Sequence, residues 1–173
     1  MAALKELIMR FAPAAAALSL ALAITASMGS ASERAPDPRA AAMIELGRTA
    51  LASGDAQGAV DAFESAMALD PGHTPVLLDL ARAARAQGLQ GKAIRYYREA
   101  LLRDPGNLAA ISGEGEALVE KGALEKAKRN LAKLESMCGA SCPETAQLQL
   151  TIRQGSQRRM AASEPAAATA TQN

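Results

Sequence analysis

The chain has 173 residues, with 19 Lys and Arg against 18 Asp and Glu, and it is 49% hydrophobic but only 2% aromatic. This length suits one ordinary domain, and the balanced charge argues against nucleic-acid binding, which needs a basic surface. One His and two Cys are too few for a four-ligand zinc site without added carboxylates. About a quarter of the residues are alanine, and so few aromatic residues disfavour an all-β fold. The composition therefore predicts a small all-α protein.

Residues 1–31 have the composition of a signal peptide. Lys5 and Arg10 precede an apolar run over residues 11–28, and residues 29–31 are the small residues that a signal peptidase recognises. The run is nearly long enough to span a bilayer, so an uncleaved membrane anchor is the alternative. We expect cleavage, and with it a protein exported to the bacterial periplasm or secreted.

A period of 34 residues fills the middle of the chain, after a lead-in linker at residues 32–39. The string LDPGH at residues 69–73 recurs as RDPGN at residues 103–107. Glycine recurs at the same interval, at Gly54, Gly88 and Gly122. Three registers follow from this period: residues 40–73, 74–107 and 108–141. Each register predicts two helices, because glycine can end the first in a left-handed conformation and proline stops the second.

Small residues and one large residue recur at matching places in the first two registers. The first has Gly47, Ala59, Phe63, Ala66 and Pro71, and the second has Ala81, Ala93, Tyr97, Ala100 and Pro105. This pattern resembles the tetratricopeptide repeat family. The third register departs from it at Glu114, Leu134 and Gly139. The resemblance implies an all-α fold, a right-handed superhelix of three antiparallel helix pairs with one concave face.

The sequence after the repeats predicts one more helix and then a tail. Pro143 opens an amphipathic run, and we expect residues 142–158 to form a C-terminal capping helix over the last repeat. Residues 159–173 are rich in Ala and Thr and have no apolar period. Such a segment buries too little surface to offset its ordering entropy, so we expect the tail to be disordered.

The resemblance implies protein binding rather than catalysis. In the family, the first helix of each repeat lines the concave face. Carried over by position, this groove comprises Ile44, Arg48, Leu51, Leu78, Arg82, Arg85, Ser112, Glu116, Val119 and Glu120. We expect a non-enzymatic adaptor of the bacterial cell envelope that binds a protein or peptide partner. No cofactor, metal, nucleic acid or small-molecule substrate is expected, and membrane contact is expected only if the N-terminal segment is uncleaved.

Two features remain that could carry chemistry. Cys138 and Cys142 are separated by three residues, and in an exported protein such a pair favours a structural disulfide that pins the capping helix to the stack. Free thiols or a thiol-redox accessory are the alternatives, although redox pairs more often have the Cys-x-x-Cys spacing. His73 lies in a predicted turn without a companion catalytic group. A membrane-anchored envelope or pilus assembly factor is the other alternative function.

Overall fold

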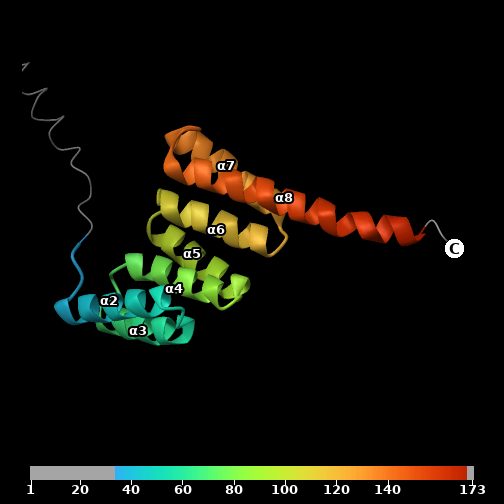
Figure 1. Ribbon diagram of the computed structural model, residues 1–173. Coiled ribbons are helices and arrows are strands. Elements are labelled where there is room, and N and C mark those ends of the chain that lie inside the picture. Colours follow the sequence, from blue (N-terminus) through green and yellow to red (C-terminus); the bar gives the residue numbers. More distant parts are fainter. Residues whose placement is uncertain (1–33, 171–173) are drawn as a thin grey trace, which may run out of the picture. The chain divides into compact units, whose positions relative to one another are not determined.

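The computed structural model describes residues 34–170 of the chain, and within this range it contains seven helices and no strand (Figure 1). The helices are α2 (Pro38–Ala52), α3 (Ala56–Leu69), α4 (Pro75–Ala86), α5 (Gln90–Arg103), α6 (Leu108–Glu120), α7 (Leu124–Cys138) and α8 (Pro143–Ala170). The predicted signal peptide at residues 1–31 and residues 171–173 of the predicted tail lie outside the described residues. None of the helices in the described range combines the length and the apolar character that crossing a membrane requires.

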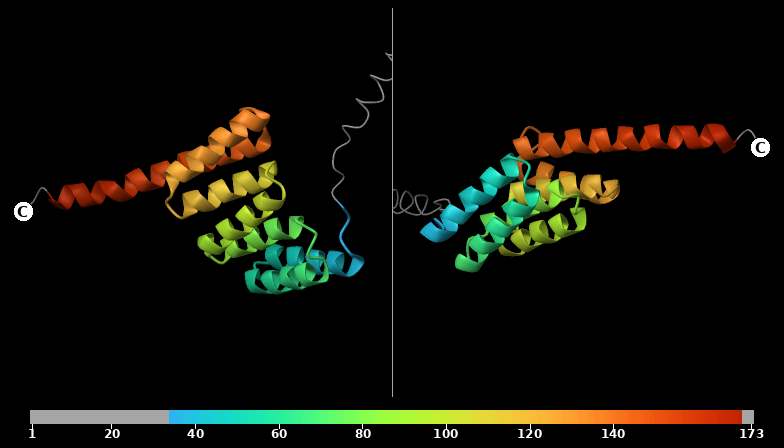
Figure 2. Two further views of the ribbon diagram at one scale, coloured as in Figure 1. Left: turned by 180° about the vertical axis from the view of Figure 1, so that it is seen from behind. Right: turned by 60° about the horizontal axis from the view of Figure 1, so that its bottom comes forward.

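The helices form consecutive pairs, α2 with α3, α4 with α5 and α6 with α7, stacked in chain order (Figures 1 and 2). The first helix of each pair is followed by Gly54, Gly88 or Gly122, with φ angles of +87°, +74° and +81°. The predicted left-handed glycines are therefore confirmed. The stack is the all-α repeat superhelix that the sequence pattern predicts.

Two clusters of buried side chains stabilise the stack, and helix α4 contributes to both of them. Leu80 packs with the residues of α2 and α3, while Leu77 packs with those of α5, α6 and α8. The large residue of each of the first two repeats is buried, with Phe63 0% exposed and Tyr97 2% exposed. Because α4 contributes apolar side chains to both clusters, it connects the core of the first pair with that of the third.

Glu114 shows why the third repeat departs from the pattern. It stands where a leucine is expected, and it is 8% exposed. Its carboxylate accepts hydrogen bonds from Arg98 Nε at 2.7 Å and Asn130 Nδ2 at 3.0 Å. A buried carboxylate needs such partners to offset its desolvation. Polar contacts to α5 and α7 thus replace the apolar contact that leucine would make.

Helix α8 covers α6 and α7 as the predicted capping helix. A Cβ atom added to Gly115 of α6 would lie 2.6 Å from Cδ2 of Leu148, so the two helices approach closely there. Prediction and structure differ at the C-terminal end, because α8 continues to Ala170 and projects beyond its neighbours (Figure 2). The predicted boundary at residue 158 is too early. Alanine favours helix even without tertiary contacts, so the absence of an apolar period does not end the helix there.

Candidate functional site

A pocket of about 310 Å³ opens between the first helices of successive units, α4, α6 and α8. Helix α5 adds one side chain, that of Tyr97. The lining residues are Arg82, Arg85, Tyr97, Ala109, Ser112, Gly113, Glu116, Pro143, Glu144 and Gln147. The pocket therefore combines an aromatic ring and small residues with charged groups of both signs.

Helical spacing brings these residues onto one surface. Arg82 and Arg85 are three residues apart on α4, so their side chains share a face. The same holds for Ser112 and Glu116 on α6, which are four residues apart. Gly113 leaves room for the Tyr97 ring, because a Cβ atom at this glycine would overlap that ring. The aromatic wall of the pocket thus depends on a residue without a side chain.

Arg85 is held by two carboxylates from α6. Its guanidinium lies 2.8 Å from Glu116 Oε2 and donates hydrogen bonds through Nε and Nη2 to Glu120. Burial acts to lower the pKa of Arg85, but the hydrogen bonds that it donates to Glu120 and the nearby charges raise the pKa overall. Arg85 is therefore a fixed cation whose charge is compensated inside the protein, and it ties α4 to α6.

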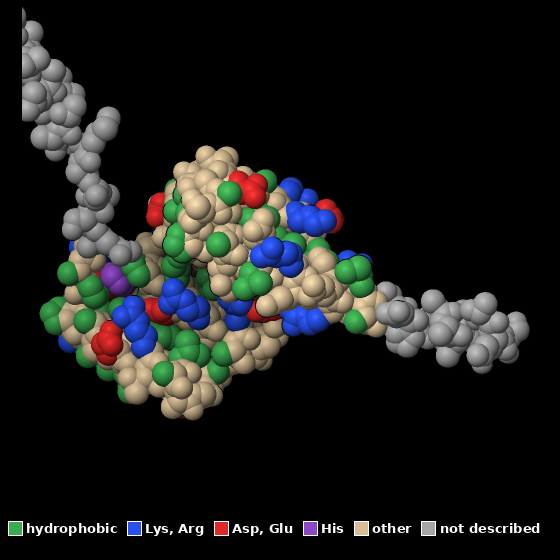
Figure 3. Space-filling model, turned by 45° about the horizontal axis from the view of Figure 1, so that its top comes forward, with side chains coloured by type: hydrophobic (Ala, Val, Ile, Leu, Met, Phe, Trp, Pro, Cys, Tyr) green, Lys and Arg blue, Asp and Glu red, His purple; other side chains and the backbone are tan. Residues whose placement is uncertain are grey.

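Arg82 has a different environment from Arg85. Asp79 has a side chain only 4% exposed, and it accepts hydrogen bonds from Arg82 and from Arg48 of α2. Half of each arginine side chain is nevertheless exposed, 52% for Arg82 and 51% for Arg48. Asp79 was missed in the sequence, where the only signal is a charged residue inside the apolar run VLLDLA. One buried carboxylate thus orients two solvent-facing cations (Figure 3 shows Lys and Arg side chains across the middle of one face).

The structure brings together four of the ten residues predicted to line the groove: Arg82, Arg85, Ser112 and Glu116. Glu120 pairs with Arg85 beside the pocket, and Arg48 lies outside it. Ile44, Leu78 and Val119 are 3%, 8% and 5% exposed and belong to the core, and Leu51 packs against it, so none of these four lines the pocket. The first helices pack mainly against the second helices of the same and adjoining pairs, and these aliphatic side chains are buried in that packing.

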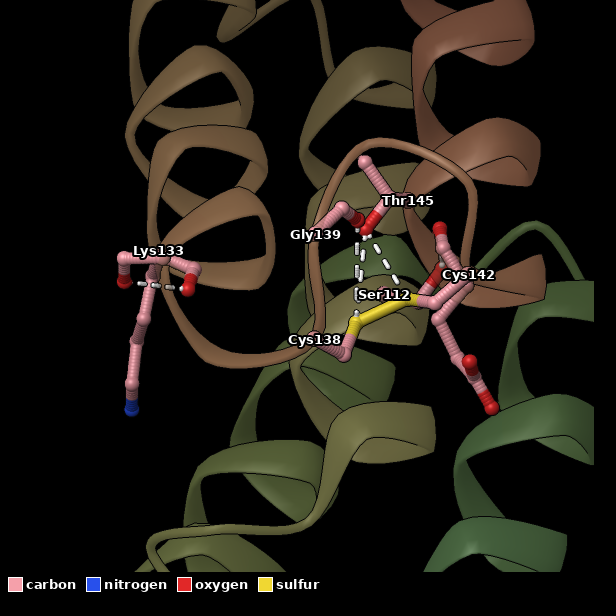
Figure 4. Close-up of a disulfide and its surroundings, with 8 residues drawn as sticks. Ser112, Lys133, Cys138, Gly139, Cys142 and Thr145 are labelled. Carbon is pink, nitrogen blue, oxygen red and sulfur yellow. Dashed lines mark hydrogen bonds between the residues drawn. A yellow bond between two sulfur atoms is a disulfide. The ribbon is translucent and has the colours of Figure 1, made fainter.

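The sulfur atoms of Cys138 and Cys142 lie 1.98 Å apart, joined as a disulfide between the end of α7 and the start of α8 (Figure 4). The hydroxyl of Thr145 contacts both sulfurs, at 3.5 Å and 3.0 Å. With Glu144, the two cysteines form the group of potential metal ligands found among the described residues. Sulfurs that are bonded to each other do not act as thiolate ligands.

Comparisons with known proteins agree with this arrangement. Residues 50–89 and residues 76–109 each match a family model described as tetratricopeptide repeat. No curated protein sequence matches the chain.

Several solved structures are similar to this chain. The Sgt2 TPR domain from Aspergillus fumigatus is 25% identical, with a TM-score of 0.62 over 76% of this chain and 88% of that one. The first TPR of Spaghetti, bound to an HSP90 peptide, is 21% identical, with a TM-score of 0.62 over 72% and 97%. The Yersinia enterocolitica secretion chaperone SycD, in complex with a peptide of the translocator YopD, is 21% identical, with a TM-score of 0.58 over 68% and 92%.

Proposed function

Because this chain is a tetratricopeptide repeat protein, we propose that it is an adaptor that binds a peptide segment of a partner protein between α4, α6 and α8. The observation that carries the proposal is the pocket of about 310 Å³, which has the size of a specific ligand site. Two of the similar structures, those of Spaghetti and SycD, contain bound peptides. Their identity to this chain is low, so they support a peptide as the kind of ligand and not its sequence.

The pocket offers complementary chemistry to an extended peptide. Arg82 donates to Asp79 through Nη1, and its exposed half leaves other guanidinium N–H groups facing the pocket and solvent. Such donors suit a backbone carbonyl or a carboxylate of the ligand. The Tyr97 ring, Ala109 and Pro143 supply apolar surface against which one ligand side chain can pack. A peptide with an apolar anchor and an adjacent acceptor group fits this combination.

A peptide array tests the proposal directly. The full chain is applied to immobilised 12-residue peptides, and its Ala109→Trp variant is applied in parallel. Ala109 is exposed and lines the pocket, so tryptophan fills the pocket without entering the core. We expect the wild type to retain a related subset of peptides and the variant to lose it.

The matched control for this experiment is Ala132→Trp, which places the same side chain on an exposed position of the outer helix α7. Charge reversal at Arg48 or Arg82 is a poorer test, because either change removes a partner of the buried Asp79. Equal binding by the wild type and both tryptophan variants would contradict a ligand site in the pocket.

We also propose that the protein works in the bacterial cell envelope after export. The signal-like composition of residues 1–31 and the cysteine pair support this location. Mass spectrometry of the protein recovered from the periplasm should give a mature chain that lacks these residues. An intact N-terminus would instead favour the membrane-anchored assembly factor.

A further inference from the structure

The disulfide adjoins the pocket. Cys142 directly precedes Pro143, and Pro143, Glu144 and Gln147 form the wall of the pocket that α8 contributes. We name this segment, residues 143–147, the α8 wall. Thr145 of the same turn is 1% exposed and touches both sulfurs (Figure 4). The position of the wall is thus coupled to the geometry of the cysteine pair.

Two separate sets of contacts hold helix α8 on the stack. Its deeper turns are held by packing, since Leu148 and Ile152 are 0% and 7% exposed and Gly155 lies against Val119. In the α8 wall only Thr145 is buried, whereas Pro143, Ala146 and Gln147 are exposed. Ser112 donates a hydrogen bond to the Glu144 carbonyl at 3.2 Å, and the disulfide anchors the residue that precedes the wall. The wall is therefore the part of α8 that adjoins the link to α7.

We propose that the Cys138–Cys142 disulfide positions the α8 wall for ligand binding, so that its reduction weakens peptide binding while α8 stays docked. This inference rests on the proposed peptide-binding function. Reduction by a dithiol breaks the S–S bond and gives two thiols, and the dithiol supplies two electrons and two protons as it closes to its own disulfide. Freed from the bond, residues 139–142 regain conformational freedom, and the wall with them.

Pocket binding is sensitive to such a change because the wall is one of its sides. If the ligand binds only molecules in which the wall is ordered, its apparent affinity falls in proportion to the fraction of such molecules. The hydrogen bond from Ser112 and the packing of Thr145 then remain, and the hydrogen bond joins an α6 residue of the pocket to the loosened turn. Redox state would in this way adjust the affinity of the adaptor without unfolding the repeats.

Hydrogen exchange on the full chain tests the structural half of the inference. The Ala146 amide donates to the Cys142 carbonyl at 3.0 Å, so its exchange reports on the first turn of α8. Dithiothreitol should speed exchange at residues 146 and 147 and leave residues 148–156 protected. EDTA is included because the freed thiols and Glu144 have ligand atoms within 4.8 Å of one another. Loss of protection along all of α8, or no change, would overturn the inference.

Peptide affinity tests the functional half, with the tightest peptide from the array as the probe. We expect Kd to rise about five- to tenfold on reduction. The Cys138→Ser/Cys142→Ser variant should bind like the reduced wild type and should not respond to dithiothreitol, which controls for other effects of the reductant. Equal affinities of the oxidised and reduced wild type would overturn this inference alone. If neither form bound any array peptide, the proposed function would fail as well.

Discussion

Single residues decide how closely the helices of each repeat approach. A Cβ atom on Gly47 would lie 2.5 Å from Cε1 of the fully buried Phe63, whereas one on Gly91 would find only Lys121 Nζ, at 3.9 Å. We expect Gly47→Ala to lower the free energy of unfolding by about 1–3 kcal/mol, because the ring or the backbone must move. Gly91→Ala should be neutral or stabilising by up to about 1 kcal/mol. Urea denaturation measures both, and equal effects would contradict the packing described.

The burial of Tyr97 in the pocket predicts that the stability of the protein depends on pH. Burial raises the pKa of Tyr97, and Arg85 offsets part of this effect. The folded-state pKa is thus higher than the unfolded value of about 10. The contribution of the Tyr97 hydroxyl to stability should be complete below about pH 10 and be lost as pH rises above it.

Comparison with Tyr97→Phe isolates that contribution. The difference in unfolding free energy between wild type and variant should stay constant from pH 7 to pH 9 and change as the pH rises past about 10. A difference that stayed constant up to pH 11 would show that burial does not shift this group.

At the level of the helices, the sequence was most informative where the backbone requires a glycine with positive φ or where a proline ends the helix. The left-handed glycines after α2, α4 and α6 and the two Asp-Pro-Gly strings after α3 and α5 predicted five helix ends. The extent of α8 was not predicted, because helix propensity alone sustains its C-terminal part. The burial of Asp79 and Glu114 could not be assigned from sequence either, since each has a partner on a distant helix, Arg48 of α2 and Asn130 of α7.

The two halves of helix α8 should contribute differently to the stability of the protein. Its buried side chains, Thr145, Leu148 and Ile152, all lie in its first three turns, whereas residues 157–162 are exposed. Leu148→Ala should lower the free energy of unfolding by about 2–4 kcal/mol, since it opens a cavity beside Gly115. A chain that ends after Met160 should unfold at the same urea concentration as the wild type. Thermal melting followed by circular dichroism provides a second measure of both changes.

At the scale of the whole molecule, the first helices of successive units form the pocket, and the second helices lie behind them. Of the residues predicted to line the groove, Arg82, Arg85, Ser112 and Glu116 lie at this pocket, whereas the aliphatic residues Ile44, Leu78 and Val119 lie in the core. The difference has a physical cause: aliphatic side chains are buried against neighbouring helices, whereas arginine and glutamate keep their charged ends at the surface. The pocket therefore takes up only part of the predicted groove.

The most direct test of the account is to map the bound array peptide onto the full chain by NMR chemical-shift changes of backbone amides. We expect the largest changes at residues 82–85 of α4, 109–116 of α6 and 143–147 of α8, the three segments that meet at the pocket. They should be absent in the Ala109→Trp variant and present in Ala132→Trp. Changes concentrated instead on the outer helices α3, α5 and α7 would contradict the account.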